Sequence, residues 1–213
     1  MKHNKTYHSK EVRTINGPLH IEGPITTDLL SSLDFHEDLT AFRPAKLQHK
    51  ALIEISKLPE GRIIIARNDN QIVGYVTFLY PHPLERWSHG KMKDLIELGA
   101  IEVIPFFRAS GVGKSLLSVS MMDEAMDNYI IISTEYHWHW DLQGTNLTIW
   151  QYRKMMEKLM HHGGLRLCET DDPEITSHPA NCLMVRVGKK VPRESLQQFH
   201  RLRFMHQYSK DLN

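Results

Sequence analysis

The stretch over residues 98–125 constrains the fold of this chain more than any other. It opens with an apolar run at 98–104, which predicts a buried strand, and Pro105 ends that strand because proline has no N–H group to donate to a neighbour. A glycine-containing loop at 108–115 follows, and beyond it apolar residues recur every four positions, as on one face of a helix. The sequence therefore predicts a strand, a tight loop and a helix in succession.

Two glycines give this loop its chemical character. Gly111 and Gly113 can adopt positive φ angles, and they leave room for a ligand to approach the backbone. The N–H groups of the first helical turn have no partner within the helix, and the helix dipole places partial positive charge there. The loop is therefore predicted to bind an anion, above all a phosphate group.

One phosphate-binding loop of similar sequence is the P-loop, G-x-x-x-x-G-K-[ST]. Gly113-Lys114-Ser115 matches its end, but Arg108 stands where the first glycine of the motif belongs. This interpretation predicts ATP binding. A glycine turn that arose by chance and binds nothing is a second alternative.

The loop resembles more fully the coenzyme site of the GNAT family of N-acetyltransferases. Their signature is Arg or Gln, two residues, Gly, one residue, and Gly or Ala, and Arg108, Gly111 and Gly113 match it between a predicted strand and helix. The resemblance implies acetyl-CoA as the cosubstrate, with its acetyl carbonyl polarised by N–H groups of the strand. The residues expected to bind it are Ile101, Val103, Arg108, Ala109, Ser110, Gly111, Val112, Gly113, Lys114, Ser115 and Asn146.

The same resemblance implies the fold, which is α/β (α+β). A central mixed, mostly antiparallel sheet with a splayed pair of parallel strands is expected, flanked by helices and closed by a C-terminal helix. At 213 residues the chain can form a single domain, 1–213, with a coenzyme-binding core at about 61–165. The expected strands are 19–21, 62–67, 72–80, 98–104, 129–134, 165–168 and 182–187, and the expected helices are 27–33, 48–58, 147–162 and 192–208.

Polar and turn-forming segments carry further expectations. Residues 1–18 are polar and are expected to be loosely held. The segment 81–93, with an exposed-looking Trp87, is either a loop that meets substrate or a plain connection. Thr145 or Asn146 is expected to cap the helix at 147–162.

Charge and cysteine content narrow the classes of function. The formal net charge of +1 gives no general attraction to nucleic acid or membrane, and neither is an expected partner. No apolar run approaches the roughly 20 residues that a membrane helix needs. Cys168 and Cys182 are too few for a disulfide framework, so a reducing, cytoplasmic location is expected.

Transfer of an acetyl group to a lysine requires a base, because the lysine pKa is about 10.4. Glu97 and Glu102 are the two candidates, and their opposite parity places them on opposite faces of a regular strand. A charge inside an apolar run is costly without a partner or a task, which favours Glu102 slightly. A structural salt bridge is the alternative role for each.

The general acid is less clearly marked. The GNAT family often has a Tyr about one turn before the glycine that ends the helix expected at 147–162, where it protonates the leaving thiolate. Leu159 and Met160 stand there in this chain, and Tyr152 lies two turns further back. Tyr152 is therefore the remaining candidate.

An aromatic run at 135–141, EYHWHWD, follows the strand at 129–134. His137 and His139 would share a face, but two ligands without a third do not make a metal site, and no metal is expected. The run predicts a pocket wall or a contact with a protein partner, because Trp and Tyr are enriched at such surfaces. A place in the core is the alternative.

The whole chain resembles one branch of the GNAT family, the acetoin-utilisation acetyltransferases of bacilli. The stretches that carry this resemblance are 37–44, 58–67, 83–87, 94–103 and 177–184. It implies a cytoplasmic protein lysine acetyltransferase that modifies and inactivates acetyl-CoA synthetase in the control of acetate and acetoin metabolism. A small-amine acetyltransferase and a non-catalytic protein that senses acetyl-CoA are the alternatives.

Overall fold

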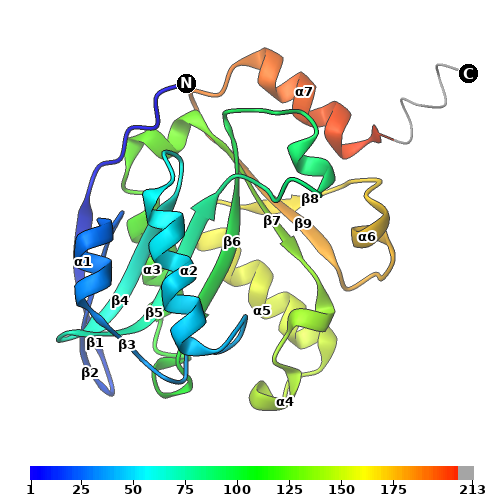
Figure 1. The fold of residues 1–213 in the computed structure, drawn as a ribbon. Helices are drawn as coiled ribbons and strands as arrows, with labels where there is room; N and C mark the ends of the chain where they lie inside the picture. Colours follow the sequence, from blue (N-terminus) through cyan, green and yellow to red (C-terminus); the bar gives the residue numbers. More distant parts are fainter. Residues whose placement is uncertain (206–213) are drawn as a thin grey trace, which may run out of the picture. The chain divides into compact units, whose positions relative to one another are not determined.

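The computed structural model describes residues 1–205 (Figure 1). They fall into two compact units. The N-terminal unit comprises residues 2–79 and 98–126, and the C-terminal unit comprises Met1, residues 80–97 and the chain from 127 onward. One long strand, β6 (Leu95–Val103), contributes to both units. The interpretation of 1–213 as a single domain stays a prediction.

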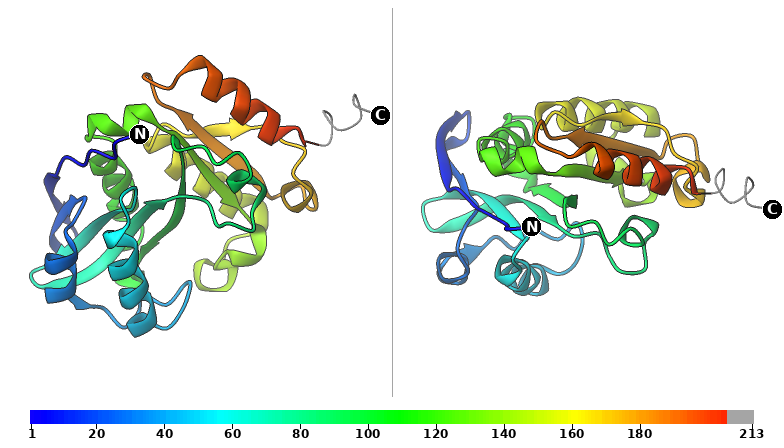
Figure 2. Two further views of the ribbon diagram at one scale, coloured as in Figure 1. Left: turned by 45° about the horizontal axis from the view of Figure 1, so that its top comes forward. Right: turned by 90° about the horizontal axis from the view of Figure 1, so that it is seen from above.

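The N-terminal unit is built on a mostly antiparallel sheet. Its order is β1 (His8–Thr14), β2 (Gly17–Gly23), β4 (Arg62–Asn68), β5 (Gln71–Leu79) and residues 98–103 of β6, with the short β3 (Asp34–Phe35) parallel to β5. Helices α1 (Thr27–Ser32) and α2 (Ala45–Lys57) lie on one face, and α3 (Val112–Ser120) covers the other (Figure 2). Because both faces are covered, the central strands are continuous apolar runs.

The first strand corrects an expectation. Residues 1–18 were expected to be loosely held, but β1 pairs with β2 along its whole length, from His8↔Gly23 to Thr14↔Gly17. The side chains of β1 are polar because most of them face solvent at the edge of the sheet. Backbone hydrogen bonds hold this strand, and they leave no hydrophobic pattern in the sequence.

The C-terminal unit has a second group of strands. Residues 95–97 of β6 pair in parallel with β7 (Ile130–Glu135), which pairs antiparallel with β9 (Cys182–Val187), and β8 (Arg166–Cys168) pairs with β9. The parallel pairing is confined to Leu95–Glu97 against Ile130–Ile132. The predicted mixed, mostly antiparallel sheet that includes a pair of parallel strands, here β6 and β7, is therefore confirmed.

Two helices cover these strands. Helix α5 (Ile149–His162) lies on one side of β7 and β9, and α7 (Arg193–Arg203) lies on the other (Figure 2). Short helices α4 (Leu142–Thr145) and α6 (Pro173–Thr176) precede α5 and β9. Thr148, rather than Thr145 or Asn146, caps α5 through a capping box with Gln151. The last part of the helix expected at 192–208 lies outside the described residues.

Trp87 is part of the core of the C-terminal unit. It was expected to be exposed, but only 2% of its surface is accessible, and it clusters with Ile132 of β7 and with Phe199 and Leu202 of α7. The loop that carries it is covered because α7, more than 100 residues further along the chain, packs on the same face. Within residues 1–205, no helix combines the length and the apolar character needed to cross a membrane.

Candidate functional site

The loop before α3 has the backbone shape of an anion-binding turn. Ala109 (φ 59°) and Gly111 (φ 79°) are both in the left-handed region, a conformation that occurs in backbone turns that bind anions. Gly111 is the N-cap of α3, and no side chain caps the helix. A Cβ added at Gly111 would meet nothing within 4 Å. The start of α3 is thus uncapped by any side chain, with open space beside Gly111.

Contacts within the N-terminal unit hold this loop. The Nε of Arg108 donates to the carbonyl of Val103 at 3.1 Å, which ties the loop back to β6. The side-chain amide of Asn16 donates to the carbonyl of Phe106. Ser115 is buried, and its backbone N–H begins the intrahelical pattern by donating to the Gly111 carbonyl. The uncapped amides and the empty space at Gly111 fit a phosphate group such as the diphosphate of acetyl-CoA.

Glu102 lies on β6 in the N-terminal unit, between the predicted coenzyme contacts Ile101 and Val103. It is 5% exposed, and each carboxylate oxygen accepts a hydrogen bond. The backbone N–H of Ala41 donates to Oε1 at 2.7 Å, and the Tyr75 hydroxyl donates to Oε2 at 2.8 Å. This carboxylate therefore has the partners that a charge in an apolar run needs, and it fastens the loop around Ala41 to the sheet.

Glu97 lies on the part of β6 that belongs to the C-terminal unit. Its register partner in β7 is Ile132, so the Glu97 side chain shares a face of the sheet with Ile132 and Thr134. The Thr134 hydroxyl donates to Glu97 Oε1 at 3.0 Å. Burial raises the pKa of Glu97 to about 8, and the negative charge of Glu85 adds to the rise. Such a carboxyl can exchange a proton near neutral pH, as a general base must.

Sequence reasoning missed Thr134 and Glu85 as neighbours of Glu97. Thr134 lies two residues beyond Ile132, and its approach to Glu97 depends on the register of two parallel strands. Glu85 comes from the segment 81–93, which was considered as a loop that meets substrate. The presence of Glu85 in that loop is the one sequence signal that could have indicated it.

The remaining predicted residues are on the opposite side of the C-terminal unit or at its surface. The ring of Tyr152 on α5 stacks on Trp140, with ring centroids 5.2 Å apart. Glu97 lies on the same face of the sheet as Ile132, and Ile132 packs with Phe199 and Leu202 of α7. Helix α5 covers the opposite face, so the structure does not bring Tyr152 and Glu97 together (Figure 2). Asn146 is exposed and ends α4 in a left-handed conformation (φ 53°).

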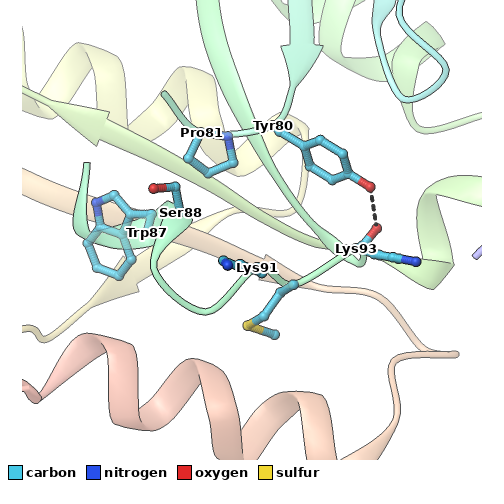
Figure 3. A pocket seen from close by; sticks show the side chains of 7 residues that line it. Tyr80, Pro81, Trp87, Ser88, Lys91 and Lys93 are labelled. Carbon is cyan, nitrogen blue, oxygen red and sulfur yellow. Dashed lines mark hydrogen bonds between the residues drawn. The ribbon is translucent and has the colours of Figure 1, made fainter. Parts of the chain in front are cut away.

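A small cleft of about 180 Å³ lies in the C-terminal unit, and none of the predicted site residues lines it (Figure 3). Its walls come from the segment that links β5 to β6, and the hydroxyl of Tyr80 donates to the Lys93 carbonyl across it at 3.2 Å. The lining residues are Tyr80, Pro81, Trp87, Ser88, Lys91, Met92 and Lys93. The lining holds two lysines and no carboxylate, so this cleft does not suit a cationic amine. In the described part of the chain, no three His, Cys, Asp or Glu side chains are grouped as metal ligands.

Comparisons with known proteins agree with this architecture. The acetyltransferase (GNAT) family model matches residues 32–137. The chain is 62% identical to the acetoin utilization protein AcuA of Bacillus subtilis (strain 168) over 208 residues, which cover 98% of this chain and 99% of that protein. It is 64% identical to the protein of the same name from Bacillus licheniformis, with the same coverage.

Two solved structures are similar as well. The crystal structure of an acetoin utilization protein from Exiguobacterium sibiricum 255-15 matches with a TM-score of 0.95 at 53% identity, over 97% of this chain and 98% of that one. A GNAT-family acetyltransferase from Streptococcus pneumoniae matches with a TM-score of 0.51 at 11% identity, over 80% of this chain and 99% of that one. The second likeness concerns the fold alone.

Proposed function

Because this chain belongs to the GNAT family of acetyltransferases, we propose that it transfers the acetyl group of acetyl-CoA to a lysine of acetyl-CoA synthetase and thereby inactivates that enzyme. The acetyltransferase class follows from the family. The lysine acceptor, its identity and the residues that act on it are the proposal. It places the protein in the cytoplasm, in the control of acetate and acetoin metabolism, and the two free cysteines, Cys168 and Cys182, agree with a reducing compartment.

The observation that carries the proposal is the uncapped start of α3. No side chain caps this helix, and two left-handed residues, Ala109 and Gly111, precede it. The backbone N–H groups of residues 112–114 would hold the diphosphate of acetyl-CoA, and Arg108 and Lys114 add positive charge to the same loop. Bound there, the coenzyme supplies an acetyl group activated as a thioester. This assignment sets the P-loop interpretation aside.

Glu97 is the proposed base. The acceptor lysine arrives mainly as an ammonium ion, since its ordinary pKa is about 10.4. Thr134 holds Glu97 Oε1, which leaves Oε2 to take one proton from that ammonium. The amine nitrogen then forms a bond to the acetyl carbon while the carbon–sulfur bond breaks. The nitrogen loses its second proton as the amide forms, and that proton neutralises the coenzyme thiolate, which leaves as a thiol. The raised pKa of Glu97 makes its carboxylate a strong enough base to accept that proton near neutral pH.

Glu102 receives a different role in this proposal. The contacts of both its oxygens, to Ala41 and Tyr75, support a carboxylate that organises the sheet and the neighbouring loop. The slight preference for Glu102 that came from its apolar surroundings is therefore reversed in favour of Glu97. Both assignments are open to direct test.

Mass spectrometry of purified acetyl-CoA synthetase, after incubation with this protein and acetyl-CoA, tests the proposal. We expect acetylation of a lysine and loss of synthetase activity, both dependent on acetyl-CoA and both strongly reduced with the Glu97→Gln variant. Acetylation of polyamines or free amino acids, with the synthetase unmodified, would show a small-amine enzyme instead. Binding of acetyl-CoA without any transfer would show a sensor.

A further inference from the structure

An exposed aromatic pair follows β7 in the C-terminal unit. The rings of Tyr136 and Trp138 stack with centroids 4.8 Å apart and planes at 15°. Trp138 leaves 49% of its surface exposed, although burial of a ring of this size is strongly favourable. Large, half-exposed aromatic rings that a neighbour already holds in place are typical centres of protein–protein contact, because little entropy is lost when they bind.

Carboxylates lie beside this pair, and among residues 1–205 neither Glu85 nor Glu174 forms an ion pair with a Lys or Arg side chain. The Tyr136 hydroxyl donates to Glu174 Oε2 at 3.3 Å, and the negative charges of Glu174, Asp172 and Glu85 all act on Tyr136. Oε2 of Glu85 is buried and accepts no hydrogen bond from the described residues. Burial raises the pKa of Glu85, and the charges of Glu174 and Asp172 add to this, while His82 opposes it.

The nearby arginine does not neutralise Glu85 and Glu174. Arg86 pairs with Asp171 at 2.7 Å and with Asp172 at 3.4 Å. Two carboxylates that repel each other thus remain next to the aromatic pair. An incoming ammonium ion would relieve that repulsion and give the buried oxygen of Glu85 a donor.

The aromatic pair is continuous with the proposed base. Thr134 and Tyr136 are two residues apart on the chain as β7 ends, so their side chains lie on the same face of the extended backbone. Thr134 also donates to Glu97. The exposed Trp138 therefore stacks on Tyr136, which shares a face with Thr134, the hydrogen-bond partner of Glu97.

We propose that Glu85, Tyr136, Trp138 and Glu174, named here the acceptor surface, dock the lysine-bearing segment of the acceptor protein. The rings of Tyr136 and Trp138 pack against that segment, and the carboxylates of Glu85 and Glu174 attract its ammonium group and direct it to Glu97. The partner is a cationic protein segment, chosen by charge complementarity. The inference rests on the proposed function and adds the residues that select a protein lysine.

Steady-state kinetics with the acceptor protein tests this surface. We expect Trp138→Ala to raise the KM for the protein about tenfold or more, as the loss of a central Trp does at other interfaces, with the KM for acetyl-CoA unchanged. Glu174→Gln should raise the same KM and weaken its dependence on salt, since an exposed ion pair is screened by ions. The matched controls are Trp150→Ala, which removes a 54% exposed Trp of α5, and Glu194→Gln on α7; both should behave as wild type.

The outcomes separate this inference from the proposed function. Wild-type protein that acetylates no protein lysine would refute both. Wild-type transfer with Trp138→Ala and Glu174→Gln indistinguishable from the controls would refute the acceptor surface and leave the function standing. An equal rise in KM for a free polyamine would also refute it, because the surface would then serve small amines. If circular dichroism shows that Trp138→Ala is unfolded, Glu174→Gln alone tests the acceptor surface. The Glu174 side chain is exposed, so this substitution leaves no cavity.

Discussion

Replacing Glu97 by Gln should change both the rate of acetyl transfer and its dependence on pH. The substitution keeps the size of the side chain and removes its ability to accept a proton. Loss of a general base at a positioned site lowers turnover by about 10²–10⁴-fold. Because the coenzyme loop is unaltered, the affinity for acetyl-CoA should stay at the wild-type value.

The expected pH profile follows from the raised pKa. With a pKa of about 8, roughly a tenth of Glu97 is a carboxylate at pH 7 and roughly nine tenths at pH 9. The kcat/KM for the acceptor protein should therefore rise about tenfold between pH 7 and pH 9 and then level off. In Glu97→Gln the reaction depends on lysine that is already neutral, so its rate should keep rising about tenfold for each pH unit through pH 9.

The assay is the initial rate of thiol release from acetyl-CoA at several concentrations of acceptor protein, across pH 6 to 9.5. Thr134→Val provides a second test, because it removes a hydrogen bond that favours the Glu97 carboxylate. The pH at which the rate levels off should therefore rise in Thr134→Val and return to the wild-type value in Thr134→Ser. The reasoning would be refuted by a wild-type profile that is flat above pH 6, or by the same profile in Glu97→Gln.

Three further predictions concern stability and the coenzyme loop. Glu97 is protonated up to about pH 8 in the folded chain but ionises near pH 4.5 when unfolded, so the folded state loses stability as the pH rises between these values. Glu97→Gln should therefore raise the free energy of unfolding at pH 9 by at most about 5 kcal/mol, seen as a higher Tm, and should leave Tm unchanged at pH 4. Glu102→Gln should destabilise the fold by about 1–3 kcal/mol in urea, because one donor from Ala41 or Tyr75 loses its acceptor, yet its pH profile should still bend near 8; a lost bend would make Glu102 the base. Gly111→Ala and Gly17→Ala should each lower the free energy of unfolding by about 1–2 kcal/mol, because both positions have positive φ and open space. Only Gly111→Ala should weaken acetyl-CoA binding in calorimetry. Equal binding by both variants would show that the loop does not bind the coenzyme.

Local patterns were sufficient for most elements of the fold. The apolar run at 98–104 covers the C-terminal part of β6 and one residue beyond it, and the spacing of apolar residues placed α1, α2 and α5 to within a few residues. These elements could be predicted because their buried faces require apolar residues at regular spacings in the sequence. The glycine turn before α3 could be predicted as well, because Gly111 has the positive φ expected of it, while its role in binding the coenzyme stays a prediction.

Features that depend on distant partners could not be predicted. Trp87 is buried because α7 covers it, and nothing near Trp87 in the sequence shows this. The surroundings of Glu97 and Glu102 differ because Thr134 contacts one, whereas Ala41 and Tyr75 contact the other. Each of these contacts depends on strand register or on loop packing, which a single sequence does not encode locally.

A crystal structure of this protein with acetyl-CoA would test the central claim most directly. We predict that the diphosphate lies within hydrogen-bond distance of the backbone N–H groups of residues 112–114, with Arg108 beside it. Acetyl-CoA bound at any other place, with the turn at Gly111 unoccupied, would contradict the claim.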